Sequence, residues 1–402
     1  MWSMSSKSVC GSFSMARRIA ATALVAVIAG AGLAGCTIER SSNAAESTEM
    51  EEAVKDTPAT ISVKDGSTEV EPGVPVTVST PAGLESVTMT NEDGKEVESS
   101  MNADGTEWTT AEPLGYGREY TVKAMTKLGT ASFSTFTTVS PRLQMAGYIS
   151  PAEDSEVGVA QAIMFSFDVA PQDRQAVQDA ITVETSNDTE GGFYWLEPGR
   201  LIWRPKEYWQ PGTSVTVNAD LYGRDFGNGV YGEADVSTNF TVGEDVRTEV
   251  DNNTKTLTVY RNGEEVKSFK IALGRDGSFD TPNGTYVVGD QHNQKVMDSR
   301  TFGLSLDSGG YVTPVNYATQ LSWSGIYVHS APWAVWALGE RNVSHGCINA
   351  KPEDAKWYLQ NVKRGDPVEI VNTKGDTLPG TDGLGYWNID WETIKAGNAD
   401  EG

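Results

Sequence analysis

The chain has 402 residues, which is long enough for two to four domains that each bury a core of their own. Its 55 acidic and 31 basic residues give a formal charge of −24. This balance argues against nucleic-acid binding and against electrostatic adhesion to anionic lipid, because both need basic patches, and it suits a soluble exported protein.

The N-terminus has the pattern of an export signal. Arg17-Arg18 follows Met15, which is a second possible start beside Met1, and precedes an apolar run, 19–33, that is too short to span a bilayer comfortably. The run ends in Leu-Ala-Gly-Cys36, which resembles a bacterial lipoprotein signal. We therefore expect a signal peptide over 1–36, with a lipid on Cys36 that anchors the protein to the outer face of the cell membrane.

Two β-rich modules are predicted after a short tether. Residues 37–57 are rich in Ser, Ala and Glu, with almost no large apolar residue, and favour a disordered linker. Short alternating segments separated by turns predict one β-sandwich over 58–146 and another over 147–247. A weak repeat supports two copies of one fold, because Tyr120-Thr-Val-Lys-Ala is similar to Val215-Thr-Val-Asn-Ala.

Two features of the second module have a structural and a functional interpretation. Its aromatic residues could bind glycan, but their large apolar area favours core packing or contact with a neighbouring domain. They are Trp195, Trp203, Tyr208 and Trp209. The oxygen-rich run from Asp225 to Gly229 could hold a cation, whereas an ordinary Asn-Gly turn explains it better.

A third, mixed β domain is predicted over 248–372. A strand, turn and strand open it, and a long insertion between Gly289 and Tyr327 favours an irregular binding loop or lid. A short helix begins near Pro352, and 367–371 form a closing strand. The tail, 373–402, contains Tyr and Trp residues, so we expect it to dock on a neighbouring domain.

The chemistry-bearing residues gather in this third domain. Cys347 is the last of three cysteines, and His329 and His345 precede it by 18 and 2 residues. A cysteine becomes a strong nucleophile when a neighbour lowers its pKa or removes its proton. An unpaired cysteine in an exported protein is a liability unless it has a function, which favours Cys347 as a nucleophile.

These residues have two other interpretations. A lone cysteine is usually a small buried apolar side chain, and a lone histidine is usually a satisfied polar group. One cysteine and two histidines could also ligate zinc, but a fourth ligand at the usual spacing is missing from the sequence. No metal is therefore predicted.

The joint pattern is more specific than any one residue. His329 followed by Ser344-His345-Gly346-Cys347-Ile348-Asn349 resembles the signature of the L,D-transpeptidases with a YkuD-type catalytic domain. The similarity extends to Tyr327-Val-His329-Ser330-Ala-Pro-Trp333, to Ser324-Gly325 and to the Lys-Arg-Gly-Asp-Pro-Val run at 363–368. The mycobacterial type of this family carries two immunoglobulin-like domains before the catalytic one, as expected here.

The resemblance implies a role for each matching residue. Cys347 would be the nucleophile, His329 the base and the Ser330 carbonyl its orienting partner. Backbone N–H groups at Gly346 and Cys347, with His345 and Ser344, would form the oxyanion loop. The residues implied in substrate binding are Met297, Tyr311, Ser324, Gly325, Trp333 and Asn349.

The function implied is 3→3 cross-linking of peptidoglycan stem peptides through a Cys347 thioester, with release of D-Ala and no cofactor. Acylation of Cys347 by carbapenems is also implied. Three alternatives stay open: an L,D-carboxypeptidase that uses the same residues, a non-catalytic wall-binding lipoprotein, and a cysteine endopeptidase, whose local signatures differ.

Overall fold

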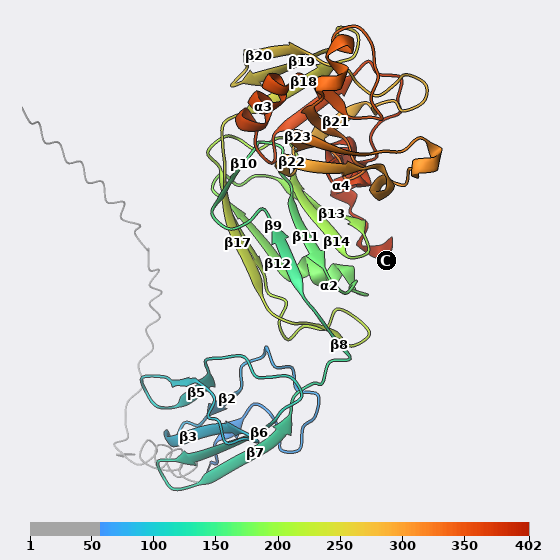
Figure 1. Cartoon of the computed structure of the whole chain (residues 1–402). Helices are drawn as coiled ribbons and strands as arrows, with labels where there is room; N and C mark the ends of the chain where they lie inside the picture. Colours follow the sequence, from blue (N-terminus) through green and yellow to red (C-terminus); the bar gives the residue numbers. More distant parts are fainter. Residues whose placement is uncertain (1–56, 402) are drawn as a thin grey trace, which may run out of the picture. The chain divides into compact units, whose positions relative to one another are not determined.

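The structure is a computed structural model that describes residues 57–401, and these residues are mainly β structure (Figure 1). The predicted signal peptide, the lipidation site at Cys36 and nearly all of the predicted tether lie outside the described residues. No helix within 57–401 is both long and apolar enough to cross a membrane.

The first sandwich has two antiparallel sheets, in the orders β1-β2-β5-β4 and β3-β6-β7. Alternate side chains along β6 point into a core with Trp108 and Phe136. The strands are β1 (Thr60–Ile61), β2 (Thr77–Ser79), β3 (Leu84–Asn91), β4 (Ser99–Met101), β5 (Glu107–Thr110), β6 (Glu119–Thr126) and β7 (Ala131–Thr137).

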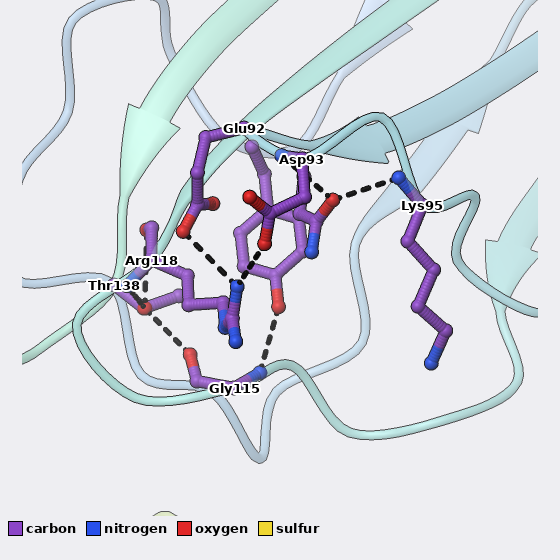
Figure 2. Close-up of polar contacts among 8 residues, drawn as sticks. Glu92, Asp93, Lys95, Gly115, Arg118 and Thr138 are labelled. Atoms are coloured by element: carbon purple, nitrogen blue, oxygen red, sulfur yellow. Dashed lines mark hydrogen bonds and ion pairs between the residues drawn. The ribbon is translucent and has the colours of Figure 1, made fainter.

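Hydrogen bonds fix the loop before β6, which carries Gly115 and Arg118 (Figure 2). The hydroxyl of Tyr120 accepts a hydrogen bond of 2.8 Å from the Gly115 N–H, five residues upstream, which is the tyrosine-corner arrangement of immunoglobulin-like sandwiches. Arg118, on the same loop, donates to the carboxylates of Glu92 and Asp93 at 3.1 and 3.0 Å. The turn after β3, which carries Glu92 and Asp93, is thereby tied to the start of β6.

The second sandwich repeats this plan. Its sheets have the orders β13-β14-β11-β9 and β10-β17-β15-β12, and β16 pairs with β8. The elements are β8 (Leu143–Met145), β9 (Gly147–Ser150), β10 (Ser155–Val157), β11 (Ile163–Phe167), α2 (Arg174–Asp179), β12 (Ile181–Thr185), β13 (Gly191–Glu197), β14 (Arg200–Pro205), β15 (Ser214–Ala219), β16 (Val230–Gly232) and β17 (Val236–Val242).

The sequence repeat and the core role of the aromatics are confirmed. The repeated segments lie in paired strands in both modules, with Val122 opposite Ser134 in one and Val217 opposite Thr238 in the other. The three tryptophans of the second sandwich are at most 7% exposed. The run from Asp225 forms a turn, in which the Asp225 carboxylate accepts from the Gly227 N–H.

Two sheets build the C-terminal domain. One has the order β20-β19-β18-β26-β21, and the other, β22-β23-β24-β25, carries the motif residues. The elements are β18 (Val246–Asp251), β19 (Thr256–Arg261), β20 (Glu264–Lys270), β21 (Gly284–Val287), β22 (Gln291–Asp298), η1 (Ser299–Phe302), η2 (Leu306–Ser308), β23 (Val312–Gln320), β24 (Tyr327–Ser330), η3 (Pro332–Ala337), β25 (Ile348–Ala350), α3 (Pro352–Asn361) and β26 (Pro367–Val371).

The prediction of an irregular insertion between Gly289 and Tyr327 is wrong in its main part. Strands β22 and β23 pair antiparallel from Gln291 to Asp298 and form a long hairpin, and only its tip is irregular (Figure 1). The run Gln-His-Asn-Gln-Lys lacks the apolar alternation that marks a strand. Backbone hydrogen bonds to the neighbouring strands hold the hairpin instead.

The tail folds back onto the second sandwich. Its elements are η4 (Gly380–Asp382), η5 (Tyr386–Asn388), α4 (Trp391–Ala396) and η6 (Ala399–Glu401). The Tyr386 hydroxyl accepts from the Ala162 N–H and donates to the Ala160 carbonyl, both at 3.0 Å. The tail therefore joins the second sandwich to the C-terminal domain.

Candidate active site

Strand pairing brings the two central motif residues to one cavity. Strands β24 and β25 run parallel with His329 opposite Asn349, and Cys347 precedes β25. A cavity of about 480 Å³ is lined by both side chains. A parallel pair needs a crossover connection, and the segment with η3 supplies it, which explains the 18-residue spacing.

The surroundings of His329 define its tautomer. The side chain is 5% exposed, and its Nδ1 lies 3.0 Å from the Ser330 carbonyl oxygen. A carbonyl can only accept, so Nδ1 carries the hydrogen when the ring is neutral, and Nε2 keeps the lone pair. Burial lowers the pKa of His329 below its usual value, against the effect of the Ser330 contact. At neutral pH the ring is therefore a base with Nε2 available.

The surroundings of Cys347 favour the protonated thiol. It is 4% exposed and lies 3.4 Å from the Gly325 carbonyl oxygen, to which it donates. Burial raises the pKa of the Cys347 thiol to about 11. A standing thiolate is therefore disfavoured near pH 7, and attack by the sulfur requires a base to take the proton.

The loop before Cys347 is held by hydroxyl groups. Ser344 donates to the Cys347 carbonyl at 2.6 Å and accepts from the Gly346 N–H at 3.1 Å. Thr281 donates to the Gly346 carbonyl at 2.7 Å, and Gly346 has a φ of 122°, which favours glycine. Thr281 was missed from the sequence because nothing local marks it.

This arrangement corrects one part of the predicted oxyanion loop. The Gly346 N–H is already bonded to Ser344 and is not available to a ligand. The Cys347 N–H, by contrast, has no acceptor among residues 57–401. His345 has a ring between those of Phe279 and Tyr311, with centroids at 4.4 and 5.0 Å.

The other predicted binding residues divide into two groups. Met297, Tyr311, Trp333 and Asn349 line the cavity. Ser324 and Gly325 do not line it: the Ser324 N–H donates to Asp382, whereas the Gly325 carbonyl faces the thiol. The lining residues that sequence reasoning missed are Thr313, Val315, Ala334, Trp336 and Val343.

Comparison with known proteins identifies the chain. A family model described as the L,D-transpeptidase catalytic domain matches residues 245–370, and one described as a bacterial Ig domain matches 67–225. L,D-transpeptidase 2 of Mycobacterium tuberculosis (strain CDC 1551 / Oshkosh) is 46% identical over 346 residues, which cover 85% of this chain and 84% of that protein. This chain belongs to the L,D-transpeptidase family.

Two further relatives agree with this assignment. L,D-transpeptidase 5 of Mycobacterium tuberculosis (strain ATCC 25618 / H37Rv) is 31% identical over 345 residues, which cover 82% of this chain and 74% of that protein. A solved structure of the L,D-transpeptidase LdtMt1 in complex with imipenem matches with a TM-score of 0.51 at 38% identity, over 57% of this chain and all of that one.

The L,D-transpeptidase resemblance and the mainly β fold with immunoglobulin-like domains are thus confirmed. The chain is an enzyme, which contradicts the alternative of a non-catalytic wall-binding lipoprotein. The geometry described above shows how the residues of this L,D-transpeptidase are arranged for thiol chemistry.

Proposed function

We propose that this enzyme forms 3→3 cross-links between peptidoglycan stems through a thioester on Cys347. The observation that carries the proposal is the cavity that the Cys347 thiol shares with the His329 imidazole, whose Nδ1 lies at the Ser330 carbonyl and whose Nε2 is left to accept. Burial favours the protonated thiol and the neutral ring. His329 takes the thiol proton as the sulfur attacks the carbonyl between the L-centre of diaminopimelate and the terminal D-Ala.

The first half of the reaction expels D-Ala. The Cys347 N–H is the donor that we assign to the developing oxyanion, a contact whose loss costs about 3–4 kcal/mol in other acyl-transfer enzymes. The C–N bond breaks, and the imidazolium of His329 returns its proton to the leaving amine. A thioester remains on Cys347.

The second half joins the two stems. The side-chain amine of a second stem attacks the thioester carbonyl, a new C–N bond forms and the C–S bond breaks. His329 takes a proton from the amine, which must lose one to become an amide, and the thiolate is reprotonated. The Ser330 carbonyl keeps the imidazole in the required orientation throughout.

Mass spectrometry of the products from a purified disaccharide tetrapeptide tests this proposal. The expected products are free D-Ala and a cross-linked dimer that lacks one D-Ala. Formation of the tripeptide alone would identify an L,D-carboxypeptidase, in which water resolves the thioester, and would contradict the proposal.

We also propose that carbapenems, imipenem among them, acylate Cys347, since the complex of LdtMt1 with imipenem involves a relative 38% identical to this chain. Intact-protein mass after exposure to imipenem should rise by one adduct. A rise that persists in Cys347→Ser would contradict the assignment.

For localisation, we propose a lipid anchor at Cys36 on the outer face of the cell membrane, with the catalytic domain in the wall. The support is the sequence that ends in Leu-Ala-Gly-Cys36. Labelling with a lipid precursor should require Cys36, and a Cys36→Ala protein that is still labelled and held on the membrane would contradict the anchor.

A further inference from the structure

The walls of the catalytic cavity come from two separate parts of the chain. The β22–β23 hairpin contributes Met297, Tyr311, Thr313 and Val315, and several of these pack in one apolar cluster with Cys347. The short helix η3 contributes Trp333, Ala334 and Trp336. A transpeptidase must bring two stems to one sulfur, so two walls offer a place for each.

The position of the base distinguishes the two walls. The ring centroid of His329 lies 6.2 Å from that of Trp333, on η3. In the second half-reaction the attacking amine must transfer a proton to His329, and a base acts only within hydrogen-bond reach of that proton. The acceptor stem therefore has to pass the η3 wall.

The side chain of Trp336 lies on the wall that the acceptor stem has to pass. Residues three apart on a 3₁₀ helix share one face, so Trp333 and Trp336 are neighbours on η3. Their side chains are 53% and 60% exposed, although both line the cavity. Large aromatic rings exposed at a cavity rim are a recurrent feature of binding surfaces.

Arg341 adds a charge to this rim. Its guanidinium lies 4.3 Å above the centroid of the Trp336 ring, and it makes no salt bridge within the described part of the chain, although the neighbouring Glu340 is also exposed. Stacking orders the guanidinium and leaves its N–H edge open to a carboxylate. This positive charge contrasts with the net charge of −24 of the chain, and among residues 57–401 no Asp or Glu lines the cavity.

We propose that Trp336 and Arg341 form a binding site for the acceptor stem and determine whether an amine or water resolves the thioester. Trp336 packs on the aliphatic part of the acceptor side chain, and Arg341 binds a free carboxylate of the same stem. This inference rests on the proposed cross-linking function and assigns its second substrate to named residues.

The chemistry at this site is the second half-reaction. The acceptor amine forms the C–N bond, the C–S bond to Cys347 breaks, and the amine proton passes to His329. Water competes for the same thioester and yields the tripeptide. A bound acceptor raises the local concentration of the amine, so the ratio of dimer to tripeptide measures occupancy of the site.

The test compares variants of the whole enzyme on a purified disaccharide tetrapeptide. Trp336→Ala is expected to lower the dimer-to-tripeptide ratio about tenfold and Arg341→Gln about threefold, magnitudes typical of aromatic and arginine contacts in interfaces. Trp336→Phe should keep most of the ratio. The rate of acylation by imipenem is measured in the same variants, because the acceptor is absent from that step.

Two controls isolate the site. Arg200 lies 4.2 Å from the centroid of the Trp323 ring, a matched cation–π pair in which neither residue lines the cavity, and Arg200→Gln should leave the ratio unchanged. An acceptor stem with amidated carboxylates should bind the parent and Arg341→Gln equally, whereas Trp336→Ala should still lower its use.

The outcomes separate this inference from the proposed function. An unchanged ratio in both Trp336→Ala and Arg341→Gln would overturn the site. Slower imipenem acylation with an unchanged ratio would place Trp336 with the donor and would also overturn it. A parent enzyme that makes no dimer at all would instead contradict the cross-linking function, and the acceptor site with it.

Discussion

Two almost fully buried polar rings, Tyr386 in the tail and His329 in the cavity, show how differently this chain treats its polar groups. The hydroxyl of Tyr386 both accepts and donates a hydrogen bond to the second sandwich. His329 has one nitrogen bonded to Ser330, and the other has no partner among the described residues. Complete pairing stabilises a domain contact, whereas partial pairing leaves a reactive atom.

The groups around the two rings differ in the same way, with full pairing around Tyr386 and partial pairing around His329. At the tail, Trp387 donates to the Ala160 carbonyl, and Arg204 donates to Ile389 while its guanidinium lies 4.4 Å from the Trp387 ring centroid. At the cavity, the Cys347 thiol makes a long contact of 3.4 Å with the Gly325 carbonyl, and a backbone hydrogen bond from Tyr327 lowers its pKa only partly against burial. We infer that the tail contact is rigid and that the cavity keeps its polar atoms for substrate.

The largest expected effect comes from removing the reactive atom. Cys347→Ser should abolish acylation by imipenem, because a serine hydroxyl is far harder to deprotonate than a thiol and the site has only a neutral imidazole as base. Intact-protein mass should show no adduct, and circular dichroism should match the parent. An adduct on the serine variant would show that another residue is the nucleophile.

Disrupting the tail contact should affect stability instead of chemistry. Tyr386→Ala removes a ring that is 1% exposed and leaves polar partners unpaired, so we expect a loss of roughly 3–5 kcal/mol in the free energy of unfolding. Urea unfolding measures the loss. Tyr386→Phe should lose only about 1–2 kcal/mol, and a Tyr386→Ala protein as stable as the parent would show that the tail contact does not contribute.

Asp366 is a buried polar group that is only partly paired although it lies outside the catalytic cavity. It is fully buried, its Oδ2 accepts from the Lys363 N–H at 2.8 Å, and its Oδ1 has no partner among the described residues. Burial raises its pKa to about 7, although Lys363 and Arg261 act in the opposite direction.

The pH dependence of stability follows from that shift. A carboxyl that holds its proton more tightly when folded stabilises the protein at low pH, and this contribution is lost as pH rises from about 4 through about 7. The parent should be less stable at pH 8 than at pH 5 by about 2–4 kcal/mol. Asp366→Asn should remove most of this difference in urea unfolding. An equal difference in stability between pH 5 and pH 8 in the parent and in Asp366→Asn would show that another group titrates.

The local parts of the fold, and the motif that carries the proposed nucleophile, could be predicted from sequence. Turn residues, alternation in strands and the internal repeat specify the sandwiches because they depend on neighbouring residues. The Ser344 to Asn349 run is equally local, and its resemblance to a known family carried the function. Pro352 marked the start of α3 in the same way.

The parts that sequence could not predict depend on contacts between distant residues. Thr281 reaches Gly346 across 65 positions, and the β22–β23 hairpin is held by backbone pairing that its polar side chains do not reveal. The protonation states of Cys347 and His329 depend on burial, which motifs do not encode. Arg341 contacts Trp336 through a ring face, and nothing in its spacing marks that contact.

The pH profile of acylation by imipenem, followed as intact-protein mass from pH 5 to 9, tests most directly whether His329 and Cys347 act as one unit. In the parent, the rate should fall only in the acid range, below the usual pKa of a histidine, because burial lowers the pKa of His329, and it should be flat from pH 7 to 9. In His329→Ala the rate at pH 7 should drop at least about a hundredfold and then rise about tenfold per pH unit, because only the thiolate fraction of a thiol with a pKa of about 11 reacts. A His329→Ala enzyme that acylates at the parent rate near pH 7 would contradict the account and leave His345 as the base.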